Sequence, residues 1–292
     1  QAAHPRTHEG LNALWEKYLG PNAGNDFFLS GGTSLKALMF LKDVEKTLNK
    51  RIAIHAFFKD PTYEHVVSDI QVDSNALFWE IHEGEQGHEW YFPPIFGLGL
   101  IFNTYPITRG YKAITFNYPR ALGYQTGGKQ IEELAAYLIG NYLKTMEIPQ
   151  TIDRIIAYSM GGLVAYEVVK ILEQRGIQVK ELVVWDKPAQ LQYAPNYNHT
   201  LHPALHEYAS KLAQDAQHQF EITRYLTHHQ EMIEECVQVG QIKSNITLFY
   251  CLDGFDEEAM GDWSKLTLGT CTISPLPKGI SHYDIPMHWK KP

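Results

Sequence analysis

Residues 153–163 read DRIIAYSMGGL, which is an apolar stretch, a short turn centred on Ser159 and a second apolar stretch. This pattern predicts a strand that passes through a tight turn into a helix. Gly161 and Gly162 allow the helix to pass close to the strand because they carry no Cβ. The segment matches the nucleophile-elbow motif G-x-S-x-G except that Ala157, with one methyl group, replaces the first glycine. The segment therefore predicts an α/β sheet with Ser159 as an exposed nucleophile.

The chain beyond residue 79 alternates predicted strands with helices, which indicates a mostly parallel sheet with helices on both faces. Between Asp186 and Asn245 the alternation breaks into a long helical stretch rich in His and Gln. This stretch is too long for a simple crossover, so we predict a helical lid at about 190–242. Strands are expected at 90–95, 113–116, 154–157, 182–185, 246–251 and 271–276, and helices at 131–145 and 162–175.

The first part of the chain has a different pattern. Apolar residues recur at helical spacing over 9–19 and again from Leu35 to about Leu48, and Pro61 opens a third helical segment. The sequence therefore predicts a small helical domain at 1–73, a linker at 74–78 and the α/β domain at 79–292.

The composition argues against several classes of protein. The formal net charge is −8 and no stripe of Lys and Arg occurs, so we expect no nucleic-acid partner. No apolar run approaches the roughly 20 residues that cross a bilayer, and the start lacks a signal peptide's apolar segment, so we expect no membrane association. The three cysteines have neither metal-ligand nor disulfide spacing, so we expect no metal and a cytoplasmic location.

A serine hydroxyl becomes a good nucleophile only with a base and a group that orients the base. Hydrolases with a nucleophile elbow carry these residues in the chain order Ser, acid, His. Asp186 closes the strand after the one that leads to Ser159, so it is the first candidate for the acid. Asp253 also follows an apolar strand and remains the alternative. For the base, position selects His282, in a Gly-containing loop near the chain end. The lid histidines, His218, His228 and His229, are expected to face solvent.

An oxyanion hole requires two backbone N–H groups that point at the developing negative charge. Met160, the residue after the nucleophile, should supply one of them. The other should come from the loop after the first core strand, FPPIFGLGL at 92–100. Pro93 and Pro94 have no N–H, which leaves Ile95 as the first candidate.

The segment Asp26-Phe27-Phe28, followed by Gly31-Gly32-Thr33-Ser34-Leu35, resembles the phosphopantetheine attachment motif of peptidyl carrier proteins. It departs from that motif at Ser30 and at Thr33, where His or Asp is more usual. The resemblance implies a small four-helix bundle in which Ser34, at the start of the second helix, carries 4'-phosphopantetheine added by a phosphopantetheinyl transferase.

A carrier followed by this hydrolase pattern looks like the terminal carrier and thioesterase pair of nonribosomal peptide synthetases. The resemblance implies an α/β hydrolase in which Ser159 accepts the acyl group, His282 is the base, Asp186 orients it, and Ile95 and Met160 donate to the oxyanion. It also implies a peptidyl thioester as substrate, and upstream condensation and adenylation domains as partners. The loop FPPIFGLGL is similar to that of surfactin-type cyclising thioesterases, which favours macrocyclisation. Hydrolytic release of a peptide or polyketide-like chain, and a noncatalytic carrier or scaffold module, are the alternatives.

Overall fold

The chain folds into two compact units, Gln1–Ala76 and Leu77–Pro292, and each is described by itself. The computed structural model describes residues 9–48, 52, 54–67, 77–97, 99–119, 130–189, 203–212, 216–252 and 257–289. Within these ranges, no helix is both long enough and apolar enough to span a membrane.

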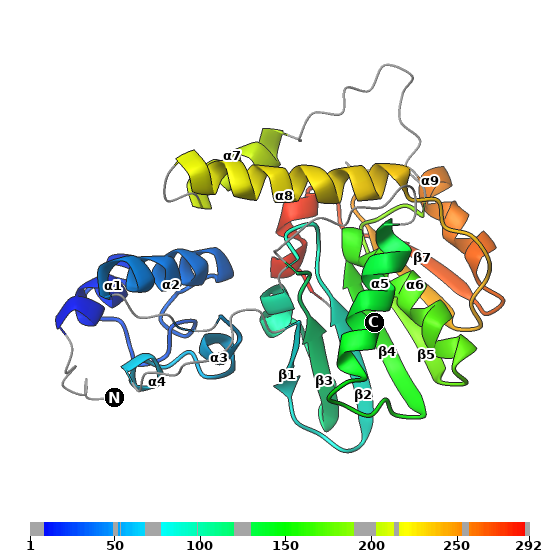
Figure 1. Ribbon diagram of the computed structural model, residues 1–292, viewed down its shortest axis with the longest axis horizontal. Coiled ribbons are helices and arrows are strands. Elements are labelled where there is room, and N and C mark those ends of the chain that lie inside the picture. The colour runs from blue at the N-terminus through cyan, green and yellow to red at the C-terminus, as the bar shows by residue number, and fades with distance from the viewer. Residues whose placement is uncertain are drawn as a thin grey trace. The chain divides into compact units, whose positions relative to one another are not determined.

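The first unit is a helical domain (Figure 1). Its core is aromatic. Trp15 is fully buried, and its ring meets those of Phe27, Phe40 and Tyr63 edge-on at 5.3, 5.4 and 5.4 Å. The six-residue α3 is the helix that apolar periodicity did not predict, because it is too short to show a period. The helices are α1 (Glu9–Leu19), α2 (Ser34–Leu48), α3 (Ile54–Lys59) and α4 (Tyr63–Val67).

The second unit is built on a seven-stranded sheet with the order β1-β3-β2-β4-β5-β6-β7. All neighbouring pairs are parallel except β1 and β3. The six strands predicted from the sequence are present, with ends that shift by a few residues. The strands are β1 (Phe78–His82), β2 (Gly87–Phe92), β3 (Tyr111–Phe116), β4 (Thr151–Tyr158), β5 (Gln178–Trp185), β6 (Asn245–Tyr250) and β7 (Cys271–Pro275).

The edge strand β1 was not predicted. The strand is only five residues long, FWEIH, and only one of them, Trp79, is buried, so its apolar signal is weak. The expected linker at 74–78 ends on the first residue of this strand, and residues 74–76 lie outside the described ranges.

Alternate residues of the strands enter two different cores. On one face, Ile155 and Ala157 of β4 pack with α5 (Gln130–Tyr142) and α6 (Met160–Gln174). On the other face, Ile156 and Tyr158 join a second cluster that includes residues of two short 3-10 helices, η1 (Gly99–Thr104) and η3 (His282–Met287). Both faces are thus covered, one by α-helices and the other by short 3-10 turns.

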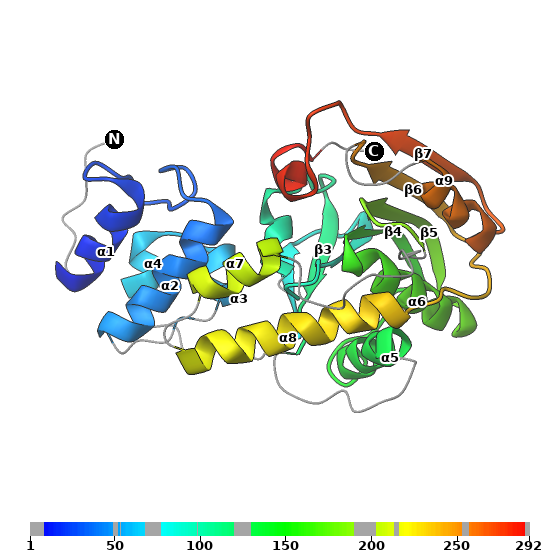
Figure 2. The ribbon, with the colours of Figure 1, turned by 90° about the horizontal axis from the view of Figure 1, so that it is seen from above.

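The predicted lid contains α7 (Pro203–Leu212) and the long α8 (Ala216–Glu235) (Figures 1 and 2). Leu226 and Met232 of α8 are buried in the core beside α5 and α6, so this helix is seated on the domain through apolar burial. The remaining elements are α9 (Glu257–Gly261) and η2 (Asp262–Leu266).

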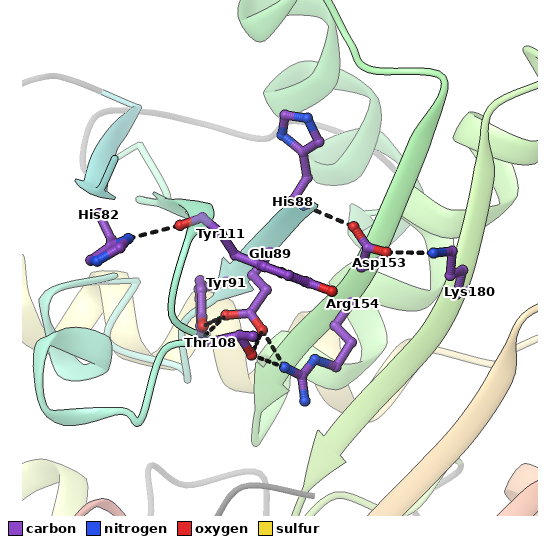
Figure 3. A network of polar contacts seen from close by, with 9 residues as sticks. All are labelled: His82, His88, Glu89, Tyr91, Thr108, Tyr111, Asp153, Arg154 and Lys180. Carbon is purple, nitrogen blue, oxygen red and sulfur yellow. Dashed lines mark hydrogen bonds and ion pairs between the residues drawn. The ribbon is translucent and has the colours of Figure 1, made fainter. Parts of the chain in front are cut away.

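A buried polar network joins β2 to β4 (Figure 3). Glu89, 1% exposed, accepts hydrogen bonds from Tyr91 Oη at 2.6 Å and from Thr108 Oγ1 at 2.6 Å, and pairs with Arg154. The charge of Glu89 is thus compensated, as a buried carboxylate requires. Beside this network, the exposed Lys180 contacts Asp153 at 2.6 Å.

Candidate active site

Ser159 lies in the tight turn between β4 and α6. Its backbone has φ 54° and ψ −127°, a conformation that non-glycine residues rarely adopt. The Ser159 N–H donates to Trp185 O at 2.8 Å, and Gly162 N–H donates to Ser159 O at 2.8 Å. These bonds hold the strained turn at the end of the sheet, which is the geometry expected of a nucleophile elbow.

The two glycines after Ser159 are required by close packing. A Cβ on Gly161 would lie 2.3 Å from Phe92 O, and one on Gly162 would lie 2.7 Å from Val184 Cγ1. Real Cβ atoms do not approach other atoms so closely. The start of α6 can therefore pass directly over β2 and β5 only because these positions lack side chains.

Asp186 follows β5 directly, next to the turn that holds Ser159. Its φ is 53°, an angle that Asp tolerates better than most residues. Asp186 is 1% exposed. Its Oδ1 accepts from Cys251 N–H at 2.7 Å, and its Oδ2 lies 2.7 Å from His282 Nδ1. Both oxygens of this buried carboxylate therefore have partners.

His282 opens η3 and is held from several sides. Tyr158, which precedes Ser159, donates its hydroxyl proton to His282 O, and the two ring centroids are 5.1 Å apart. Burial and the neighbouring Asp186 raise the pKa of Tyr158 well above its usual value, so this hydroxyl keeps its proton. A capping box between Ser281 and Asp284 fixes the start of the turn.

Trp289 supports the same loop from the C-terminal side. Its ring packs against Tyr158 at 5.6 Å, Trp185 at 5.0 Å and Phe102 at 5.8 Å. The residues after η3 thus return to the aromatic cluster beneath His282. Neither Tyr158 nor Trp289 was predicted from the sequence, because both act through contacts between distant parts of the chain.

Two backbone N–H groups near Ser159 lack a partner among the described residues. Met160 begins α6, so its N–H has no acceptor within the helix. Ile95 is 8% exposed, and its N–H makes no hydrogen bond to any of the residues that the structure describes. A buried N–H without a protein acceptor is rare, and both groups are available to an oxygen atom that carries negative charge.

Ser34 is the first residue of α2 and follows a loop that is held by its own turn residues. Asp26 Oδ1 accepts from the N–H groups of Phe28 at 2.9 Å and Leu29 at 2.8 Å. Gly31 has φ 89°, and a Cβ on Gly32 would lie 2.2 Å from the Phe27 ring. The two glycines are therefore needed to bring the chain past Phe27 into α2.

The residues around Ser34 fit a phosphodiester. Thr33 Oγ1 accepts a hydrogen bond from Lys36 N–H at 3.2 Å, so Thr33 is the residue that caps the helix. The hydroxyl of Ser34 is not used for capping. The Ser34 hydroxyl makes no hydrogen bond to another described residue. The first turn of α2, which is described in full, holds no acidic residue, and its free N–H groups favour a negative charge.

The structure thus brings Asp186 and His282 into contact beside the Ser159 turn. Asp253 lies outside the described residues, as does the side chain of His218. The expectation that His229 faces solvent was wrong, because this side chain is 0% exposed, and His228 is half-buried. No group of His, Cys, Asp and Glu side chains that could hold a metal occurs among the described residues.

Residues 90–274 match the family model described as the thioesterase domain. The chain belongs to the thioesterase family. Residues 9–70 of the chain match a second family, the phosphopantetheine attachment site. A phosphopantetheine attachment domain therefore precedes the thioesterase domain, which confirms the resemblance to the carrier and thioesterase pair of nonribosomal peptide synthetases.

Known relatives are much longer than this chain. One of the mycosubtilin synthase subunits of Bacillus subtilis is 23% identical over an alignment of 272 residues, and the alignment covers 86% of this chain and 10% of that protein. Surfactin synthase subunit 3 of Bacillus subtilis strain 168 is 24% identical over an alignment of 185 residues, and the alignment covers 61% of this chain and 14% of that protein.

Solved structures share the fold. A four-domain nonribosomal peptide synthetase, holo-AB3403 bound to AMP and glycine, superposes with a TM-score of 0.59 at 18% identity, over 98% of this chain and 25% of that one. The thioesterase domain SrfTE, whose structure was solved to explain the cyclisation of surfactin, superposes with a TM-score of 0.53 at 17% identity. The superposition covers 73% of this chain and 90% of that one. These similarities establish the fold, which is a mostly parallel α/β sheet in the thioesterase domain and a helical carrier domain before it in the sequence.

Proposed function

We propose that this chain releases a peptide from a nonribosomal peptide synthetase by acyl transfer to Ser159. The observation that carries the proposal is the 2.7 Å contact between His282 Nδ1 and Asp186 Oδ2 beside the strained Ser159 turn. The phosphopantetheine attachment domain in the same chain supports a tethered acyl substrate. Tethering raises the effective concentration of a substrate, so tight binding from solution is not needed.

In this mechanism Asp186 keeps the Nδ1 proton of His282 in place, which leaves the lone pair on Nε2. His282 takes the Ser159 proton through Nε2 while Ser159 Oγ attacks the acyl carbonyl carbon. The carbonyl oxygen becomes negative and accepts from the N–H groups of Ile95 and Met160. The C–S bond then breaks, and His282 gives its proton to the departing sulfur, which leaves an ester on Ser159.

The second half of the reaction reverses these roles. An amine or hydroxyl of the peptide attacks the ester carbon, His282 removes the proton of that group, and Ser159 Oγ recovers a proton as it leaves. The product is a ring. We favour this macrocyclisation over attack by water because the loop at 92–100 is similar to that of surfactin-type enzymes.

The 4'-phosphopantetheine group would be attached to the hydroxyl of Ser34. Once bound, 4'-phosphopantetheine supplies a flexible arm whose thiol holds the acyl chain as a thioester. The residues of the chain provide an unengaged hydroxyl at a helix start, and a phosphopantetheinyl transferase would be the partner that modifies it. Condensation and adenylation domains upstream would supply the peptide.

The first prediction concerns the attachment of phosphopantetheine to Ser34, which is called loading. Treatment with a phosphopantetheinyl transferase and coenzyme A is expected to add one phosphopantetheine to the wild-type chain and none to Ser34→Ala, as read by intact mass. The matched control is Ser30→Ala, a nearby serine in the same loop, which should load normally. Loading of Ser34→Ala would assign the attachment to another residue.

Release provides the second prediction. A peptidyl thioester loaded on the wild-type chain should leave as a cyclic product, and Ser159→Ala should retain its acyl group. Mass spectrometry distinguishes the ring from the linear acid, which is heavier by one water. If the only product is the linear acid, release occurs by hydrolysis and the proposal of cyclisation is contradicted. A folded wild-type protein whose Ser159 does not react with a fluorophosphonate would contradict catalysis altogether and leave a noncatalytic scaffold.

A further inference from the structure

The loop after β2, which offers the Ile95 N–H, is held through its carbonyl groups. The Tyr118 hydroxyl donates to Pro93 O at 2.7 Å, and the Tyr118 N–H donates to Gly97 O at 2.8 Å. Gly97 N–H donates to Pro94 O at 2.8 Å and closes a turn. Because a trans peptide places N–H and C=O on opposite sides, this last bond directs the Ile95 N–H away from the turn.

One further bond to this loop comes from the lid helix α8. His229 Nδ1 lies 2.6 Å from Ile95 O, and because a carbonyl only accepts, Nδ1 must carry the proton. The imidazole is fully buried, and its ring centroid lies 4.2 Å from that of Tyr225 and 5.7 Å from that of Tyr118. Burial lowers the pKa of His229 to about 4, so the neutral donor form persists at physiological pH.

This bond differs in kind from the other attachments of α8. Leu226 and Met232 seat the helix through apolar burial, which is non-directional and tolerates small shifts. The bond from His229 is directional, and it fixes the peptide unit that follows Ile95. With the bonds from Tyr118 and Gly97, it leaves the backbone at Ile95 little freedom to rotate.

We propose that His229 is a positioning residue for acyl transfer, which makes the placement of the Ile95 N–H depend on the seating of α8. The inference rests on the proposed roles of Ser159 and Ile95. An oxyanion donor acts only within hydrogen-bond distance of the developing charge, so a small displacement of the loop weakens it. The helix α8 would thus contribute to the oxyanion hole through His229.

The test compares two substitutions of the same buried side chain. His229→Leu removes the donor but keeps an apolar group of similar size, whereas His229→Asn keeps an N–H at the place of Nδ1. With the hexanoyl thioester of N-acetylcysteamine as probe, His229→Leu should lower kcat by about 10-fold to 100-fold with little change in KM. His229→Asn should retain most of the wild-type kcat.

A second readout separates positioning from loss of stability. In the matching dithioester, negative charge develops on sulfur, which accepts hydrogen bonds poorly, so the wild-type enzyme should prefer the thioester strongly. His229→Leu should reduce this oxygen-over-sulfur preference. Met232→Ala, which loosens the same helix without removing a donor, should keep the preference.

The outcomes distinguish this inference from the proposed function. An unchanged oxygen-over-sulfur preference in His229→Leu, or an equal loss of preference in Met232→Ala, would overturn the role of His229. Full thioester turnover by Ser159→Ala would overturn the proposed function itself. An active His229→Leu together with an inactive Ser159→Ala would reject only the positioning role.

Discussion

Replacing Asp186 with asparagine is expected to lower kcat for acyl release by about 10⁴-fold while the protein remains folded. The side chain keeps its shape, and its carbonyl oxygen can still accept from Cys251 N–H, as Oδ1 does at 2.7 Å. The amide NH₂ would then face His282 Nδ1. That nitrogen would have to accept a hydrogen bond, which places the ring proton on Nε2. In the proposed mechanism Nε2 is the atom that takes the proton of Ser159.

The matched control for this prediction is Asp253→Asn, because Asp253 is the other carboxylate that the chain order allows. Its kcat should stay within a few-fold of wild type. Turnover of a soluble acyl thioester measures both variants, and the thermal midpoint checks that each is folded. The assignment of Asp186 would be contradicted by a larger loss in Asp253→Asn than in Asp186→Asn.

The nucleophile turn could be predicted because its signals are local. The apolar strand, the serine and the glycine pair follow one another in sequence, and each has a steric reason within the turn. Gly161, for example, lies where a Cβ would meet Phe92 O at 2.3 Å. The order of strands and helices, which places Asp186 next to Ser159, followed from hydrophobic periodicity in the same way.

Features that depend on contacts between distant segments could not be predicted. A histidine in a polar helix carries no local mark of burial, so the position of His229 against Ile95 O emerges only when α8 is seated on the domain. The edge strand β1 was missed because its pairing with β3, not its own pattern, makes it a strand. Tyr158 likewise acquires its partner, His282 O, only in the folded chain.

Lys187, which follows Asp186, is a further residue that sequence patterns did not single out. It is 5% exposed, and its side chain forms no ion pair with any described residue. Burial lowers the pKa of Lys187 to about 7, although Cys236, Asp186 and Glu234 act in the opposite direction. A lysine is almost never fully buried without a partner, because the loss of hydration disfavours its charged form.

Replacing Lys187 with methionine is therefore expected to raise the free energy of unfolding, by an amount that depends on pH. In the unfolded chain a lysine has a pKa of about 10.4, so above that pH neither state is protonated and the burial of Lys187 carries no ionisation cost. As pH falls toward 7 the unfolded state gains a proton that the folded state lacks, and folding is progressively disfavoured. Below pH 7 the cost levels off. The gain from Lys187→Met should thus be about 4 kcal/mol at pH 7 and about 1 kcal/mol at pH 10.

Denaturant unfolding at the two pH values, followed by the fluorescence of the buried tryptophans of the thioesterase domain, measures this difference. The control is Lys180→Met, because Lys180 is exposed and its pKa is raised by Asp153, so its removal should bring no gain at pH 7. A gain in Lys187→Met of the same size at pH 7 and pH 10 would mean that methionine stabilises through packing. The pH dependence therefore isolates the cost of holding a lysine in the buried position beside Asp186, a cost that an apolar residue at this position would avoid.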